Sequence, residues 1–253
     1  MLTRKDWDSS FFGREIYSLG IESISAEDEL NLLISQAENN GAWAIECNLK
    51  PDFFDYAVML ENCGFRLVDS RVEFLSFVDK SQLDLSVSPP FGLLRCVEQN
   101  DLAVIRELII EGLVDNPKFF SRFKNLKLFT RDETINYFNA WIEKTFNESP
   151  ELFCVWEVDG KVVSFFNFLE YGYVNSLPLY KGILTAVSKN FQGYRAQNFM
   201  QSFLFGTFPV DQWALESTTQ LVNTAVIKNH IKSQKSFKES ILTFYFSKGL
   251  LSA

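Results

Sequence analysis

The order of the helix and strand signals constrains this chain more than any other feature of its sequence. Strands are expected where short runs are apolar or alternate, and helices where apolar residues recur three and four apart. Between residues 93 and 246, one strand precedes two helices and an antiparallel run, after which strand, helix, strand, helix and strand follow. This order predicts a mixed α/β (α+β) fold. The expected strands are 93–97, 152–158, 161–170, 180–187, 213–219 and 239–246, and the expected helices are 101–114, 132–146, 197–208 and 223–233.

A separate, smaller α/β unit is expected before this core. Its pattern predicts helix 26–39, strand 42–47, helix 53–62 and strand 65–78. The stretch from Lys80 to Pro90 is rich in Ser, Asp and Pro and is typical of a linker. We therefore expect two domains, residues 1–88 and residues 89–253.

Composition and charge exclude several classes of protein. The chain has 253 residues, of which 47% are hydrophobic and 22% charged, values typical of an ordinary folded protein. Its net charge of -8 removes the general attraction to phosphate on which nonspecific nucleic-acid binding depends. No apolar run reaches the roughly 18 residues of a membrane span, and no signal-peptide core follows the N-terminus. We therefore expect a cytoplasmic protein with no nucleic-acid or membrane partner.

The cysteines and the histidine do not form a metal-binding pattern. The four cysteines lie far apart without a Cys-x-x-Cys pair, and the chain has one histidine. A standard zinc set needs four such ligands at close spacing. No metal is expected, and each cysteine is expected to be a small buried hydrophobic residue.

Three short motifs occur in an order that resembles a known superfamily. They are Asp-Trp-Asp-Ser-Ser-Phe-Phe-Gly at residues 6–13, Ser-Arg-Phe at 121–123 and Asn-Thr-Ala at 223–225. Together with the element order, they resemble the GNAT superfamily of CoA-dependent N-acyltransferases, and within it the TDP-fucosamine acetyltransferase group. The resemblance implies a GNAT domain preceded by a truncated GNAT-like copy.

The same resemblance implies a reaction. An acyl group, acetyl or 3-hydroxybutanoyl, would pass from acyl-CoA to the amine of a dTDP-amino-dideoxyhexose such as TDP-fucosamine, by direct attack in a ternary complex. The product would serve cell-surface polysaccharide synthesis. The sequence selects neither the acyl chain nor a C3 or C4 amine. A homodimer is expected from the many Phe residues and the exposed strand ends.

The late helix carries the candidate catalytic residues. Seven residues separate Asn223 from His230, which places both within roughly 20° on one helix face. In the family pattern, the Asn lies against pantetheine and a Tyr seven residues later protonates the departing thiolate. Here that position is His230, which could act as an acid toward the thiolate or as a base toward the sugar ammonium.

The candidate CoA site precedes that helix. The strand ending at Val187 is expected to hold pantetheine through its backbone amides, and the following turn is expected to hold the pyrophosphate at a helix N-terminus. Only Gln192 fits the family's loop pattern cleanly, because Arg195 and Gln197 occupy its small positions. The predicted CoA-binding residues are Leu184, Thr185, Ala186, Val187, Gln192, Gly193, Tyr194, Arg195, Ala196, Gln197 and Asn223.

The acceptor is assigned to residues elsewhere. Arg122 suits a diphosphate and Phe123 suits a thymine ring, although a solvated basic loop explains both equally well. Glu216 and Thr219 of the expected strand 213–219 complete this predicted substrate set. Two alternatives stay open: a GNAT enzyme acting on a peptide or amino-acid amine, and a noncatalytic domain that retains the fold.

Overall fold

The computed structural model describes residues 1–117, 119, 121–125 and 128–248. Strands from both halves of the chain form one sheet, in the spatial order β1-β2-β3-β10-β4-β9-β8-β7-β6-β5. Neighbours are antiparallel except for two parallel pairs, β2 with β3 and β8 with β9. The strands are Leu2–Arg4 (β1), Glu15–Leu19 (β2), Ala42–Leu49 (β3), Arg66–Asp79 (β4), Leu93–Cys96 (β5), Phe153–Val158 (β6), Lys161–Val174 (β7), Leu177–Val187 (β8), Gln212–Gln220 (β9) and Ser236–Phe246 (β10).

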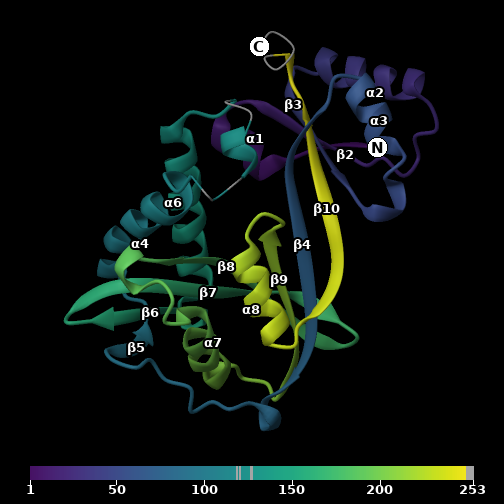
Figure 1. Ribbon diagram of the computed structural model, residues 1–253. Coiled ribbons are helices and arrows are strands. Elements are labelled where there is room, and N and C mark those ends of the chain that lie inside the picture. The colour runs from purple at the N-terminus through teal and green to yellow at the C-terminus, as the bar shows by residue number, and fades with distance from the viewer. Residues whose placement is uncertain (118, 120, 126–127, 249–253) are drawn as a thin grey trace.

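Helices cover both faces of the sheet. On one face, Trp213 of β9 packs against aromatic rings of the segment that contains α7, and α8 lies in front of the same strands (Figure 1). On the other face, α4 and α6 pack against Phe153 and Phe165. The helices are Asp6–Phe12 (α1), Glu27–Asn39 (α2), Tyr56–Asn62 (α3), Leu102–Ile109 (α4), Arg122–Asn125 (α5), Arg131–Glu148 (α6), Ala196–Thr207 (α7) and Thr224–Lys232 (α8).

Two sets of strands in the sheet, β2 to β4 and β8 to β10, repeat one pattern of connections. The parallel pair β2 and β3 is followed along the chain by α3 and the long strand β4, and the parallel pair β8 and β9 is followed by α8 and the long strand β10. Each long strand pairs with a strand of the other set: β4 pairs with β9, and β10 pairs with β3. The two long strands also pair with each other at the centre. Both sides of the proposed boundary at residue 88 thus contribute to one sheet, and the division into two domains stays a prediction.

The predicted mixed α/β fold is confirmed, and most predicted elements agree with the structure to within a few residues. The pattern failed at the N-terminus, where β1, α1 and β2 were not predicted. These elements have three, seven and five residues, which is too short to show a helical or strand period clearly. The helix predicted over 101–114 changes after Ile109 into a π-helical turn, Ile110–Val114.

Two further sequence expectations have a structural outcome. Cys47 and Cys154 are buried and Cys63 is half-buried, but Cys96 is exposed because it lies on the edge strand β5, so its predicted burial was wrong. Within the part of the chain that is described, no helix has the length and apolar character needed to cross a membrane.

Candidate active site

The parallel strands β8 and β9 separate in the middle of the sheet. They pair only over residues 179–182 and 214–217, and the last pair joins Gly182 to Ser217. Beyond it β8 continues to Val187 and β9 to Gln220, with no further pair between them among the described residues. Figure 1 shows the consequence: β6, β7 and β8 lie across the view, whereas β9, β4 and β10 run steeply. A V-shaped split therefore opens beyond the pair Gly182–Ser217, which we call its apex.

A bulge at the start of the split orients the free edge of β8. Two residues of β8 lie opposite Asn167 of β7, whose Oδ1 accepts a hydrogen bond from the Leu184 N–H at 3.0 Å. The Leu184 N–H thus points toward β7, as does that of Ser188, which bonds to a β7 carbonyl. Because successive backbone groups alternate between the two edges of a strand, those of Thr185 and Val187 point into the split. The free edge offers an extended ligand a row of backbone donors and acceptors.

The turn after β8 exposes its backbone at the start of α7. Gly193 and Arg195 both have left-handed backbone angles, with φ of 91° and 60°, and open space lies over Gly193. Arg195 is exposed and immediately precedes α7, a helix of 12 residues. Unbonded N–H groups and the helix dipole favour an anion at such an end, and a guanidinium adds direct charge. Gln192 donates to the Val187 carbonyl at 3.4 Å, Ala196 is buried, and Tyr194 packs against Trp156.

A depression of about 700 Å³ lies beside this turn, on the side of α4. It is lined by Val187 and Gln192 from the turn and by Glu107, Glu111 and Asp115 from the α4 segment. Lys189 also lines the depression, 3.8 Å from a Glu111 oxygen, and Asp115 is paired with Arg131 at 2.8 Å. The depression thus carries charges of both signs, whereas the N-terminus of α7 favours an anion.

His230 belongs to α8, as the sequence predicted, and is only 3% exposed. The centroid of its ring lies 4.9 Å from that of Phe74 on β4, a residue that pairs with Ser217. Burial, with a smaller effect from the nearby Lys235 ammonium, lowers the pKa of His230 to about 3. The ring is therefore neutral near pH 7 and has no imidazolium proton to donate. Asn223 is the N-cap of α8, and its Oδ1 accepts from the Val226 N–H at 3.4 Å.

Lys235 reaches the apex from the turn between α8 and β10. The Lys235 N–H bonds to the His230 carbonyl, and the Gln234 N–H bonds to that of Ile231. Together with the left-handed φ of 56° at Gln234, these bonds form a Schellman motif that fixes His230 and Lys235 relative to each other. The Lys235 Nζ donates to Ser217 Oγ at 2.8 Å, and burial lowers the pKa of this half-buried amine to about 8.

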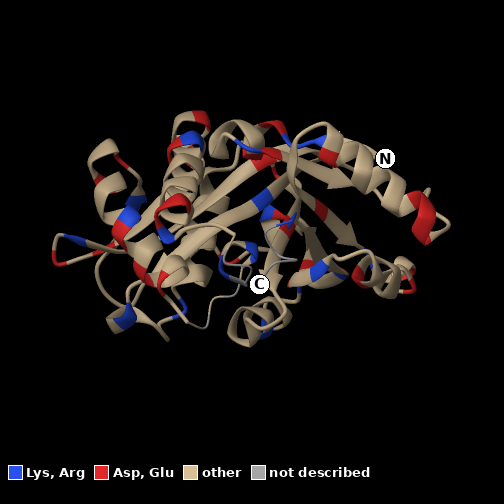
Figure 2. Cartoon of the chain, turned by 90° about the horizontal axis from the view of Figure 1, so that it is seen from above, with Lys and Arg blue, Asp and Glu red and all other residues tan. Residues whose placement is uncertain are grey.

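The opposite face of the apex is charged. Side chains alternate along β9, so Glu216 points away from α8 while Ser217 and Thr219 point toward it. Burial would raise the pKa of Glu216, but hydrogen bonds from Lys181 at 2.6 Å and Lys238 at 2.9 Å lower it below its usual value. In the view from above, basic and acidic positions lie side by side on the central strands (Figure 2). The structure therefore separates the two predicted acceptor residues of β9 onto different faces.

Arg122 is engaged in a buried ion network. Its guanidinium lies 2.6 Å from a Glu46 oxygen and 3.3 Å from an Asp8 oxygen, and Lys5 contacts both carboxylates. Glu46 also accepts from the Tyr245 hydroxyl at 2.6 Å. Burial alone would raise the Glu46 pKa, but these cations and the hydroxyl hold it well below its usual value. The network links α1, β3, α5 and β10.

Phe123 is likewise part of the interior. It is 6% exposed and packs against Phe129 and Tyr137. These contacts indicate that Arg122 and Phe123 stabilise the fold. Their predicted contact with a diphosphate and a thymine has no support in this geometry.

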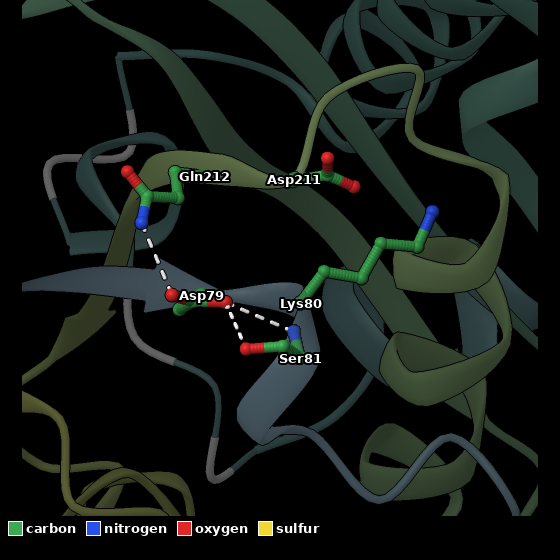
Figure 3. A pocket seen from close by; sticks show the side chains of 5 residues that line it. All are labelled: Asp79, Lys80, Ser81, Asp211 and Gln212. Atoms are coloured by element: carbon green, nitrogen blue, oxygen red, sulfur yellow. Dashed lines mark hydrogen bonds between the residues drawn. The ribbon is translucent and has the colours of Figure 1, made fainter.

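A second depression, of about 630 Å³, lies at the other end of β9. Figure 3 shows Asp79 accepting hydrogen bonds from Gln212 and Ser81. Lys80 extends away from them and donates to two carbonyls at the end of α7, one of them that of Phe208 at 3.0 Å. The polar groups of this depression serve turns and a helix end, and they lie away from the split.

Solved structures share this architecture. A GCN5-related N-acetyltransferase from Sphaerobacter thermophilus matches with a TM-score of 0.57 and 12% identity, over 92% of this chain and 73% of that one. A conserved protein of unknown function from Staphylococcus epidermidis matches with a TM-score of 0.60 and 12% identity, over 92% and 84%. The chain has the GNAT fold.

A tandem GNAT protein from the clavulanic acid biosynthesis pathway matches the GNAT fold of this chain with a TM-score of 0.55 and 10% identity, over 93% of this chain and 76% of that one. No protein-family model and no curated protein sequence matches the chain. Among the described residues, no group of three or more His, Cys, Asp or Glu side chains is placed to hold a metal ion.

Sequence reasoning missed three polar residues of the split. Asn167 contacts Leu184 across a bulge, and Lys235 contacts Ser217 from beyond the end of a helix. Neither contact follows a helical or strand period. The one sequence signal was the position of Lys235 just after a helix whose polar residues had already been singled out.

Proposed function

We propose that this chain is a CoA-dependent N-acyltransferase. The observation that carries the proposal is the free edge of β8, which runs from the apex to a turn with exposed Arg195 at the start of α7. CoA combines an extended pantetheine arm with a pyrophosphate. The edge suits the arm, and the turn suits the anion.

The residues of the split support direct acyl transfer. The acceptor amine attacks the thioester carbonyl, an N–C bond forms, the C–S bond breaks, and the amine loses a proton while the thiolate gains one. Backbone N–H groups at the free edge, those of Thr185 and Val187, would hold the acyl-pantetheine arm. The Leu184 N–H is already bonded to Asn167 and is not available as an oxyanion donor.

We propose, as the finer assignment, that the acceptor is the amine of a dTDP-amino-dideoxyhexose. Its support is the resemblance at residues 6–13, 121–123 and 223–225, together with the charged face of the apex around Glu216, which suits a polar, hydrogen-bonding acceptor. A peptide or amino-acid amine is the alternative acceptor. The repeated connection pattern of the sheet supports a further proposal, that residues 1–88 are a truncated GNAT-like copy.

Turnover with a panel of amines tests both proposals, acyl transfer itself and the amino sugar as the acceptor. Acetyl-CoA is incubated with dTDP-amino sugars, the matching UDP-amino sugars, and amino-acid or peptide amines, and released thiol is measured with a colorimetric disulfide reagent. We expect thiol release with a thymidine-linked amino sugar and not with its uridine counterpart. Release with amino-acid or peptide amines alone would overturn the sugar assignment but keep acyl transfer. If CoA binds without turnover on any amine, the noncatalytic alternative is favoured.

A further inference from the structure

Acyl transfer leaves a thiolate that needs a proton, and His230 is poorly suited to supply it. Its ring is buried against Phe74 and neutral near pH 7. Another donor is therefore expected near the leaving sulfur. This inference rests on the proposed function.

The split determines where the sulfur would lie. If the pyrophosphate binds at the turn before α7, the pantetheine arm runs along the free edge of β8 from Val187 toward Gly182. Five residues, 183–187, form this edge, which at about 3.3 Å per residue spans roughly 16 Å. The thioester end of the arm would then arrive at the apex, beside Ser217.

The ammonium group of Lys235 lies at the apex, on the face of the sheet that α8 covers. Lys235 Nζ bonds to Ser217 Oγ at 2.8 Å, and the Schellman motif at the end of α8 fixes the backbone from which it extends. Ser217 belongs to the last residue pair before the strands separate. The amine is thus anchored at the apex by a neutral hydroxyl, which leaves it further protons to donate.

We propose that Lys235 protonates the departing thiolate. The Lys235 ammonium gives one proton to sulfur and becomes a neutral amine, and the proton lost by the attacking acceptor amine restores it through solvent. The balance is one amine and one thioester giving one amide and one thiol.

The surroundings of Lys235 favour this chemistry. Burial lowers its pKa to about 8, close to the value of about 8.5 of an ordinary protein thiol, so the proton transfer is nearly balanced in energy. The neighbouring titratable group on α8 is the neutral His230. Glu216 points to the other face of β9, where Lys181 and Lys238 already bind it, so it forms no ion pair with Lys235.

The experiment measures the pKa of the thiol of bound CoA, so it needs CoA but no acceptor amine. The ionisation of the bound CoA thiol is followed by its thiolate absorbance as the pH is raised, with the complex of desulfo-CoA as the blank. An opposite charge within about 4–6 Å lowers a pKa by about 1–3 units. We expect the wild type to lower the thiol pKa of bound CoA by that amount, Lys235→Met to abolish the shift, and Lys235→Arg to retain it.

A matched control and a second variant complete the test. Lys232→Met removes an exposed ammonium near the end of the same helix and should leave the thiol pKa at its wild-type value. Lys235→Gln, which retains a donor for Ser217, replaces Lys235→Met if the latter does not fold. An equal thiol pKa in wild type and Lys235→Met, with CoA bound to both, would overturn the role of Lys235 and leave the proposed function standing. If calorimetry shows no CoA binding to the wild type, the proposed function fails as well.

Discussion

Replacing Arg122 by Met should destabilise the fold severely. The side chain of Arg122 is 21% exposed, and those of Glu46 and Asp8 are about 5% and 6% exposed. Its removal leaves Lys5 as the remaining cation for two buried carboxylates. Removing one partner of a buried ion pair typically costs about 3–5 kcal/mol because a buried charge loses its compensation. We expect a loss of that size in the free energy of unfolding.

Urea unfolding measures this loss. Arg131→Met is the matched control, because the pair of Arg131 with Asp115 is exposed and should contribute at most about 1 kcal/mol. The difference between wild type and Arg122→Met should also depend on pH. The Glu46 pKa is held low in the folded state, so its stabilisation is fully present above the unfolded value of about 4.3 and shrinks as the pH falls below it. If Arg122→Met lost less than about 1 kcal/mol of unfolding free energy but bound the acceptor amine more weakly, the structural role of Arg122 would be refuted.

Two further predictions concern the split. Arg195→Glu should weaken CoA binding about tenfold or more in calorimetry, because it reverses a charge at the N-terminus of α7. Lys228→Glu, on the exposed face of α8, should leave the CoA affinity unchanged. An unchanged affinity in Arg195→Glu would remove Arg195 from the site. His230 has a folded pKa of about 3, below its unfolded value of about 6.5, so its neutral form contributes stability that is complete above pH 6.5 and is lost as the pH falls toward 3. Between pH 7 and 5 the wild type should therefore lose roughly 2 kcal/mol more than His230→Gln, and parallel pH curves would show that the ring is not held neutral.

The sequence predicted the fold because the elements that define it are long and periodic. The two strands that form the split, β8 and β9, and the helices α7 and α8 were predicted within three residues of their ends. The spacing of seven placed Asn223 and His230 on one face of the late helix; in the structure Asn223 is the N-cap of α8 and His230 is buried near its end. Local periodicity decides features of this kind.

The chemistry of the site was harder to predict, because it depends on contacts between distant segments. Arg122 carries the residue type expected of a diphosphate ligand, but its partners Glu46 and Asp8 lie 76 and 114 residues away. The pairing of β4 with β9 and of β10 with β3 brings the halves together, and no local pattern specifies it. For the same reason, the burial that neutralises His230 could not be read from its place on a helix.

Calorimetric titration of the wild-type chain with CoA shows directly whether the split binds the proposed co-substrate. We expect saturable binding of one CoA per chain, because the free edge of β8 and the turn before α7 together form the site. Acetyl-CoA should compete for it, and Arg195→Glu should weaken it. If the folded wild-type chain shows no saturable heat of binding with CoA at millimolar concentration, the proposal that this chain is a CoA-dependent acyltransferase is contradicted.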